Sequence, residues 1–195
     1  HAASPHLAID PVVISAQVIS VVQTIISRST DPVDKALISI TKINAGTAYN
    51  VIDDQVKMGG TIRTFKKETR SYIEKRLGEL CKGIAEAHGA EIKIQFDLVN
   101  KYPPTINSKK ESIFASNVAK DLVGEDKVIT DIDPSMGGED FSYLLEEKPG
   151  TYLYLGQGDE NHKAHLHTTK YDFNDNLLPI GVNYWVELVK EFFSK

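Results

Sequence analysis

The chain has 195 residues, enough for one large domain or two small ones. Its hydrophobic fraction of 41% and charged fraction of 25% are ordinary for a globular protein. The net charge of −5 argues against a nucleic-acid partner, because neutralising phosphates requires clustered Lys and Arg. No apolar run approaches the ~18 uninterrupted residues that span a bilayer, so no membrane partner is expected. A single cysteine excludes an intrachain disulfide and fits a reducing, cytoplasmic location.

The beginning of the chain predicts one helix followed by two strands. Because the first residue is His1 and not Met, we expect the later part of a longer protein. Asp10 and Pro11 are typical of a helix start, with Asp as the N-cap and Pro at the first helical position. Apolar residues then recur at helical spacing: Ile14, Val18, Val21, Val22 and Ile25. The strands are expected at 36–43 and 55–65, and Gly59-Gly60 indicates a bulge or a close backbone approach.

A long amphipathic helix and a third strand complete the first half. The helix is predicted over 68–88, with Gly89 as its C-terminal cap, and its Cys81 and His88 are interpreted as structural. Residues 92–98 alternate between apolar and polar side chains, as a half-buried strand does. The order helix, strand, strand, helix, strand predicts a ferredoxin-like α+β domain over residues 1–100 that lacks its first strand.

The pattern of the second half predicts alternating helices and strands. Together with the first half, this predicts the α/β class for the whole chain. Tyr102-Pro103-Pro104 is the best linker candidate. Ser108 and Glu111 have the spacing of a capping box, which opens a helix. Elements are expected in this order: helix 108–123, strand 128–132, helix 140–147, strand 152–155 and helix 180–192. We therefore assign residues 101–195 to a second domain.

Two histidines in a polar loop over 157–175 are candidate metal ligands. His165 and His167 are two residues apart, so they would share one face if the backbone is extended. Neutral imidazole is the commonest side-chain metal ligand. The alternative is that one or both are exposed polar residues of a loop. His162, His165 and His167 do not form a zinc-finger spacing.

Three other features have both a functional and a structural interpretation. Gly137-Gly138-Glu139-Asp140 is at a loop-to-helix junction, which could bind an anion or simply cap the helix. Arg63 interrupts a strand and could bind a substrate carboxylate, or be an outward-facing charge. His1 and His6 flank a short segment that could equally be a flexible terminus.

Taken together, ordered segments of the chain resemble one family. They are His1-Ala2-Ala3-Ser4-Pro5-His6 with Asp10-Pro11, Gly46-Thr47-Ala48-Tyr49-Asn50-Val51-Ile52, Gly60-Thr61-Ile62-Arg63-Thr64-Phe65, Tyr102 to Asn107, Met136 to Phe141, and Leu166-His167 through Asp175. This order is similar to that of the metal-dependent amidohydrolases of the aminoacylase and carboxypeptidase group (metallopeptidase clan MH). The branch resembled is that of hippurate hydrolase, N-acyl-L-amino-acid amidohydrolase and indole-acetyl-amino-acid hydrolase. Asp53 departs from the family's usual Pro.

The resemblance implies a small dimerisation or lid domain followed by the C-terminal part of a metallopeptidase-like catalytic domain. In this family the catalytic domain is split in sequence, and its first part carries most metal ligands and the general-base Glu. The resemblance matches no segment of this chain to that first part. The implied cofactor is one or two divalent metal ions (Zn, Mn, Co or Ni). The implied partners are a small N-acyl amino acid or short peptide and a second copy of the chain, bound through the small domain.

The resemblance also implies roles for individual residues. His167 matches the metal ligand of the C-terminal segment, whereas His165 matches no ligand position. His1 matches a histidine that reaches into the partner subunit's active site and polarises the scissile carbonyl. The residues that match substrate-binding positions are Asn50, Arg63, Gly138 and Glu139, with Arg63 expected to bind the substrate carboxylate.

The implied activity is hydrolysis of the amide bond of N-acyl amino acids, which releases a carboxylic acid and a free amino acid. The chain by itself is expected to be inactive. Two alternatives stay open: a dipeptidase or carboxypeptidase of the same fold, and a non-catalytic dimerisation module.

Overall fold

The computed structural model describes residues 1–97 and 101–194, and the chain divides into two compact units. The first unit comprises residues 1–104 together with 135–139. The second unit comprises residues 105–134 and the chain from residue 140 onward. Short 3-10 turns accompany the main elements: η1 (Pro5–Leu7), η3 (Glu125–Lys127) and η4 (Asp175–Leu177).

The first unit begins with the predicted helix, α1 (Pro11–Thr24), which continues as a π-helical turn, η2 (Ile25–Ser29). The Asp10 carboxylate accepts hydrogen bonds from the backbone N–H groups of Val12 at 2.9 Å and Val13 at 3.3 Å. These bonds satisfy two of the donors that a helix start leaves unpaired. The helix start predicted at Asp10-Pro11 is therefore confirmed.

The predicted pair of strands is also present. β1 (Ala36–Ala45) and β2 (Val56–Thr64) form a two-stranded antiparallel sheet. The register shifts between Ile40 and Lys42, opposite Gly60 and Gly59. A Cβ on Gly60 would lie only 2.2 Å from the Ser39 carbonyl oxygen, so only glycine fits there. The bulge and the close backbone approach predicted from Gly59-Gly60 both occur.

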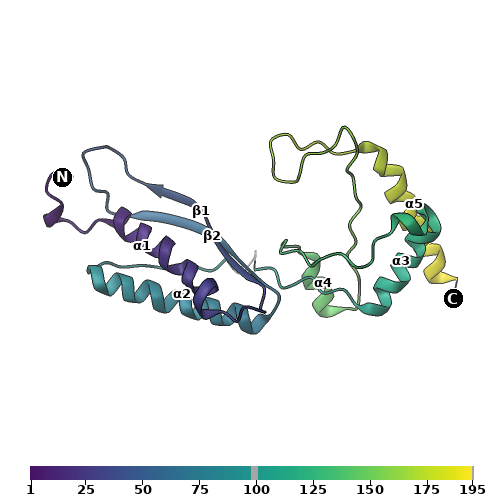
Figure 1. Cartoon of the computed structure of the whole chain (residues 1–195), viewed down its shortest axis with the longest axis horizontal. Coiled ribbons are helices and arrows are strands. Elements are labelled where there is room, and N and C mark those ends of the chain that lie inside the picture. Colours follow the sequence, from purple (N-terminus) through teal and green to yellow (C-terminus); the bar gives the residue numbers. More distant parts are fainter. Residues whose placement is uncertain (98–100, 195) are drawn as a thin grey trace. The chain divides into compact units, whose positions relative to one another are not determined.

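The core of the first unit lies between the sheet and two helices. α2 (Lys67–His88) ends at Gly89, whose φ of 64° is the left-handed C-cap conformation that glycine favours. Figure 1 shows α1 and α2 along the β1–β2 hairpin, and the buried side chains come from all three elements. The buried cluster consists of Val18, Val22, Ile25, Ile38, Ile73 and Cys81.

The helical stretch Pro11–Ser29 is long and apolar enough, by length and composition, to cross a membrane. Polar residues such as Ser15, Gln17 and Ser20 interrupt its apolar residues, which is why the sequence predicted no membrane-spanning run. A core helix of a globular protein meets the same criterion, and the inner face of this stretch supplies Val18, Val22 and Ile25 to the buried cluster.

The third strand predicted for the first half is wrong for the residues described. Residues 91–97 belong to no helix or strand, and Leu98 lies outside the described residues. Ile92 packs against the buried cluster, whereas Ile94 is exposed. The alternation therefore marks which side chains anchor the segment and does not correspond to a strand among residues 91–97. Among the described residues the sheet has two strands, with two helices along it, so the ferredoxin-like arrangement is not confirmed.

The second unit contains the three predicted helices: α3 (Lys109–Val123), α4 (Phe141–Glu147) and α5 (Leu178–Phe193). α3 and α5 pack together, and the Tyr184 hydroxyl donates to the Ala115 carbonyl oxygen at 3.1 Å. Phe114 and Phe192 meet edge to face, with ring centroids 6.3 Å apart. Trp185, on α5, is 64% exposed.

The strands predicted at 128–132 and 152–155 are wrong. Both segments belong to no helix or strand, because sheet pairing among the described residues is confined to β1 and β2. The Asn107 side chain takes the place of a neighbouring strand for Tyr152. Its Nδ2 donates to the Tyr152 carbonyl oxygen at 2.9 Å, and its Oδ1 accepts from the Tyr152 N–H at 2.8 Å.

The predicted capping box at the start of α3 is also wrong. The Ser108 side chain makes no hydrogen bond to the first turn of the helix. Its Oγ instead accepts from the Gly150 N–H at 3.1 Å, while the Ser108 N–H donates to the Gly150 carbonyl oxygen at 2.8 Å. Gly150, which is distant in sequence, has therefore replaced the first turn of α3 as the hydrogen-bond partner of the Ser108 side chain.

Candidate active site

Two of the candidate residues, His1 and Asn50, are joined through the backbone. The Ala2 N–H donates to the Asn50 carbonyl oxygen at 3.0 Å, so the first residues lie beside the loop that precedes β2. The Ala3 N–H donates to His1 Nδ1 at 3.1 Å. A neutral imidazole that accepts at Nδ1 carries its proton on Nε2. The exposed His1 ring is therefore oriented as a hydrogen-bond donor.

Arg63 and Gly138 form a second pair in the same unit. Arg63 lies on β2 opposite Leu37, and its Nη1 donates to the Ile62 carbonyl oxygen at 3.1 Å. A Cβ on Gly138 would lie 3.0 Å from Arg63 Nη2 and 3.1 Å from the Tyr102 ring. The guanidinium is half-buried, and its charge is held against a residue without a side chain. The sequence identified Arg63 and Gly138 but gave no indication of Tyr102 as their neighbour.

The junction of residues 137–140 is a turn that leads into α4. The Gly137 N–H donates to Ser135 Oγ at 3.1 Å. Asp140 is the N-cap residue of α4, but its side chain makes no capping hydrogen bond. Glu139 is half-buried. No capping hydrogen bond therefore supports the interpretation of Asp140 as a helix cap. Gly138, two residues earlier, lies against Arg63.

His167 lies in the second unit, in a loop between Gln157 and Asn174. Its φ of 63° is left-handed, which is uncommon for a residue with a side chain. The Thr168 hydroxyl donates to the His165 carbonyl oxygen at 2.9 Å, and the Tyr171 N–H donates to that of Thr168 at 3.2 Å. The first bond closes a turn that contains His167, and the second closes the turn that follows it. Both His165 and His167 are exposed.

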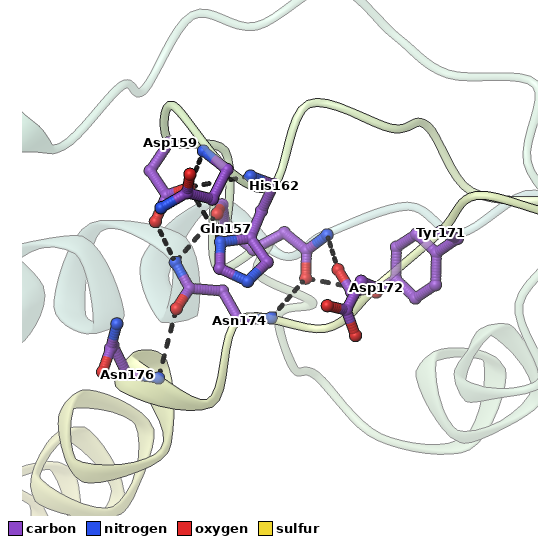
Figure 2. A network of polar contacts seen from close by, with 8 residues as sticks. Gln157, Asp159, His162, Tyr171, Asp172, Asn174 and Asn176 are labelled. Carbon is purple, nitrogen blue, oxygen red and sulfur yellow. Dashed lines mark hydrogen bonds and ion pairs between the residues drawn. The ribbon is translucent and has the colours of Figure 1, made fainter.

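A polar network that the sequence did not predict closes this loop (Figure 2). Asp159 Oδ1 accepts hydrogen bonds at 2.8 Å from His162 Nδ1 and from the N–H groups of Asn161 and His162. The His162 ring, followed by the backbone N–H groups of His162 and Asn161, lowers the pKa of Asp159. The order Asp-x-Asn-His is typical of an Asx turn and could have indicated this part of the network.

No group of three or more potential metal ligands gathers among residues 1–97 and 101–194. A dinuclear centre needs several nitrogen or oxygen ligands. These residues therefore do not complete such a centre.

The first residues also border a hollow of about 670 Å³, where they meet the loop before β2. Its lining residues are His6, Leu7, Ala8, Ile9, Ile52, Asp53 and Asp54. The described histidine and carboxylates there form no group of metal ligands. His6 is part of η1, so the structure places it in an ordered turn.

The profile of peptidase family M20/M25/M40 matches residues 6–191 of the chain. The chain belongs to this family. The match covers both units, and it includes Arg63, Gly138 and His167. This membership agrees with the family resemblance that the ordered sequence segments indicated.

Several known proteins are similar to the chain. Hippurate hydrolase of Campylobacter jejuni is 36% identical over 194 residues, which are 100% of this chain and 49% of that protein. The IAA-amino acid hydrolase ILR1-like 2 of Arabidopsis thaliana is 36% identical over 202 residues, covering 100% and 45% respectively. The crystal structure of the Bacillus subtilis YXEP protein, a dinuclear metal binding peptidase from the M20 family, matches with a TM-score of 0.67. It is 31% identical and covers 92% of this chain and 45% of that one.

The chain spans about half the length of these relatives. The M20 fold is shared over nearly the whole chain. Over that half, the chain is similar to proteins named as hydrolases and to a structure described as a dinuclear metal binding peptidase.

Proposed function

We propose that the protein containing this M20 chain hydrolyses the amide bond of N-acyl amino acids, releasing a carboxylic acid and a free amino acid. The supporting relatives are named for substrates of this kind, hippurate and IAA-amino acid conjugates. Because the chain spans about half of those relatives, the activity is assigned to a longer protein and the chain alone is proposed to be inactive.

The observation that carries the proposal is the placement of Arg63 against Gly138. An N-acyl amino acid ends in a carboxylate, and a guanidinium binds carboxylates through two parallel hydrogen bonds. Arg63 is half-exposed on β2, so part of its side chain is accessible to a small carboxylate, and the absence of a side chain at Gly138 leaves room for the guanidinium beside that residue. Asn50 and Glu139 are proposed as further substrate contacts.

Replacing Arg63 tests this role in the complete protein. R63A should raise KM for a hippurate-type substrate by about tenfold or more, because the charge-assisted bonds to the carboxylate are lost. The same variant should leave KM unchanged for the substrate's amide derivative, which has no carboxylate. R28A is the matched control, since Arg28 is an exposed arginine of the same unit, at the end of η2. Equal effects on both substrates would contradict the assignment.

We propose His167 as the metal ligand that this chain contributes. A bound divalent metal ion would polarise the amide carbonyl and lower the pKa of a coordinated water. The exposed imidazole of His167 is accessible to an ion, and the turn on either side of it fixes its backbone. H167A in the complete protein should lower metal content and hydrolysis together, with H165A as control. If H167A changes neither, the protein is better described as a non-catalytic dimerisation module.

We propose that His1 acts in the site of a second subunit, through a homodimer formed by the first unit. Its Nε2–H is oriented as a donor, as carbonyl polarisation requires. Mixing H1A and H167A proteins tests this. If His1 acts across the dimer, the mixed dimer retains one intact site, and about a quarter of wild-type activity should return for random pairing. No recovery, with mixed dimers demonstrated by mass, would contradict the arrangement.

The alternative substrate class is a short peptide, because the B. subtilis structure is that of a peptidase. Arg63 would then bind the C-terminal carboxylate of the peptide in the same way. Comparing an N-acyl amino acid with a dipeptide that has a free amino terminus distinguishes the two. A higher kcat/KM for the dipeptide would favour the peptidase.

A further inference from the structure

The loop that carries His167 is closed at its base by Gln157 and Asn174. The Asn174 N–H donates to Gln157 Oε1 at 3.3 Å, and Asn174 Nδ2 donates to the Gln157 carbonyl oxygen at 3.2 Å. Figure 2 shows the two side chains side by side, one from each stem of the loop. The stems are thus joined twice, through the side chain of each residue.

Asp159 adds a third connection between the stems. Its Oδ2 accepts from Asn174 Nδ2 at 3.0 Å, while its Oδ1 holds the turn at His162. One carboxylate therefore fixes the first stem internally and attaches it to the second. Hydrogen bonds to an ionised acceptor are stronger than neutral ones, so Asp159 strengthens the closure.

Asn174 is the centre of this arrangement. It is only 6% exposed, in a loop whose other residues are mostly exposed. Its Oδ1 accepts from the Asn176 N–H at 3.2 Å, which ties the network to η4 and so to the start of α5. A buried amide with both its N–H donors and its oxygen engaged makes the removal of any partner costly.

Tyr171 and Asp172 form a second set of connections nearer to His167. The Tyr171 hydroxyl donates to Gln157 Oε1 at 3.2 Å, and Gln157 Nε2 donates to the Asp172 carbonyl oxygen at 3.4 Å. His167 lies between the two stems in sequence, in the turn described above. The network encloses the segment that carries the His167 imidazole, and its hydrogen bonds are made by other residues.

We propose that Asn174 and Asp159 are positioning residues for His167, which hold its loop in one conformation before an ion binds. This inference rests on the proposed role of His167 as a ligand. A ligand that is already ordered loses less conformational entropy when it binds. Groups hydrogen-bonded directly to a metal ligand typically change metal affinity by about 10–100-fold when they are removed, and because Asn174 and Asp159 act through the loop backbone, an effect at the lower end of this range is expected.

Hydrogen exchange of this chain tests the closure without any metal. N174A should accelerate exchange of the hydrogen-bonded backbone amides of Asn161, His162 and Tyr171 by about tenfold, with α2 and α3 unchanged. N161A is the matched control, because Asn161 is an exposed asparagine of the same loop and uses only its backbone N–H in the network. Unchanged loop exchange in N174A, or equal acceleration in N161A, would overturn the proposal.

A milder variant decides the case if N174A disturbs α3 or α5 as well. Y171F removes one hydroxyl from the network and should accelerate exchange of the same amides about threefold. No acceleration in Y171F would then overturn the proposal.

Zinc titration of the complete protein tests the consequence for His167. N174A should weaken zinc affinity by about tenfold or more, while N161A should not. A loop that opens in N174A without any loss of zinc affinity would reduce the network to a structural role and overturn the proposal. If instead H167A binds zinc normally while the loop responds as expected, the ligand assignment fails and the closure itself stands.

Discussion

Arg63 lies against Gly138 so closely that a Cβ on Gly138 would come within 3.0 Å of Arg63 Nη2 and 3.2 Å of Nε. Arg63 and Gly138 are far apart in the sequence, yet both belong to the first unit. The segment 135–139 therefore returns to the sheet that carries Arg63. The family motifs that contain them are distant in sequence and adjacent in the structure.

Gly138→Ala is expected to destabilise the first unit by about 1–2 kcal/mol, because the added methyl group must displace Arg63 or the Tyr102 ring. Urea unfolding measures this difference. Gly137→Ala is the matched control, since its Cβ would meet only Ser135 Oγ at 3.4 Å and should cost less than about 0.5 kcal/mol. Equal costs for the two would show that Arg63 and Tyr102 move away freely.

Gly60→Ala is expected to be more damaging, at about 3 kcal/mol, because a Cβ there would collide with the Ser39 carbonyl oxygen. Hydrogen exchange of the β1 and β2 amides would report the loss of the ladder. At the neighbouring Gly59 an added Cβ meets Lys42 Cβ at an ordinary 3.8 Å, so Gly59→Ala should keep normal protection. A well-protected Gly60→Ala sheet would mean that the bulge can shift to accommodate a methyl group.

Glu74→Gln should destabilise the first unit by about 1 kcal/mol at pH 7. The carboxylate accepts from Arg70 Nε at 2.8 Å and from Lys101 Nζ at 3.0 Å, and its side chain is 17% exposed. Burial would raise the pKa of Glu74, but the hydrogen bonds from Lys101 and Arg70 outweigh it and lower the pKa.

This lowered pKa gives the difference a pH dependence with a definite sign. A carboxyl group with a lowered folded-state pKa contributes stability above its ordinary value, and the contribution is lost as pH falls through the folded-state value. The gap between wild type and Glu74→Gln should therefore be full at pH 7 and narrow at pH 3. Glu86→Gln is the control, because Glu86 is exposed and its oxygen is 3.8 Å from Lys82 Nζ. A gap that stays constant with pH would contradict the ion-pair assignment.

Asn107→Ala should cost about 1–2 kcal/mol in the second unit, since both hydrogen bonds to the Tyr152 backbone are lost together. Asn107→Asp keeps the acceptor for the Tyr152 N–H but places a carboxylate beside the Tyr152 carbonyl oxygen, so it should not restore stability. Urea unfolding monitored by fluorescence is the measurement. Asn161→Ala, in an exposed position of the same unit, should change little.

The sequence predicted well the features that depend on neighbours along the chain. The cap at Asp10, the C-terminal glycine at Gly89 and the bulge at Gly59-Gly60 each need only local backbone geometry. The apolar spacing identified Val18, Val22 and Ile25 as inward-facing, and all three are buried. Helix boundaries agreed for the same reason.

Features that need a partner from elsewhere were not predictable in this way. Alternation over 152–155 indicates which side chains share a face, but it does not say whether another backbone is present to complete a ladder. Asn107 fills that position for Tyr152, and Gly150 takes the Ser108 side chain away from its helix. Of the candidate site, Arg63 and Gly138 were identified through family motifs, whereas the closure at Asn174 depends on contacts between two stems that no spacing reveals.

The chain's one tryptophan, Trp185, is on α5 in the second unit and is 64% exposed. Its indole therefore emits from a largely aqueous environment even in the folded state, and its emission reports only on the second unit. The Trp185 emission is expected to change little when the first unit unfolds. Far-UV circular dichroism instead records the loss of α1 and α2 together with that of the helices of the second unit. A disagreement between the two optical transitions would consequently measure how independently the two units unfold.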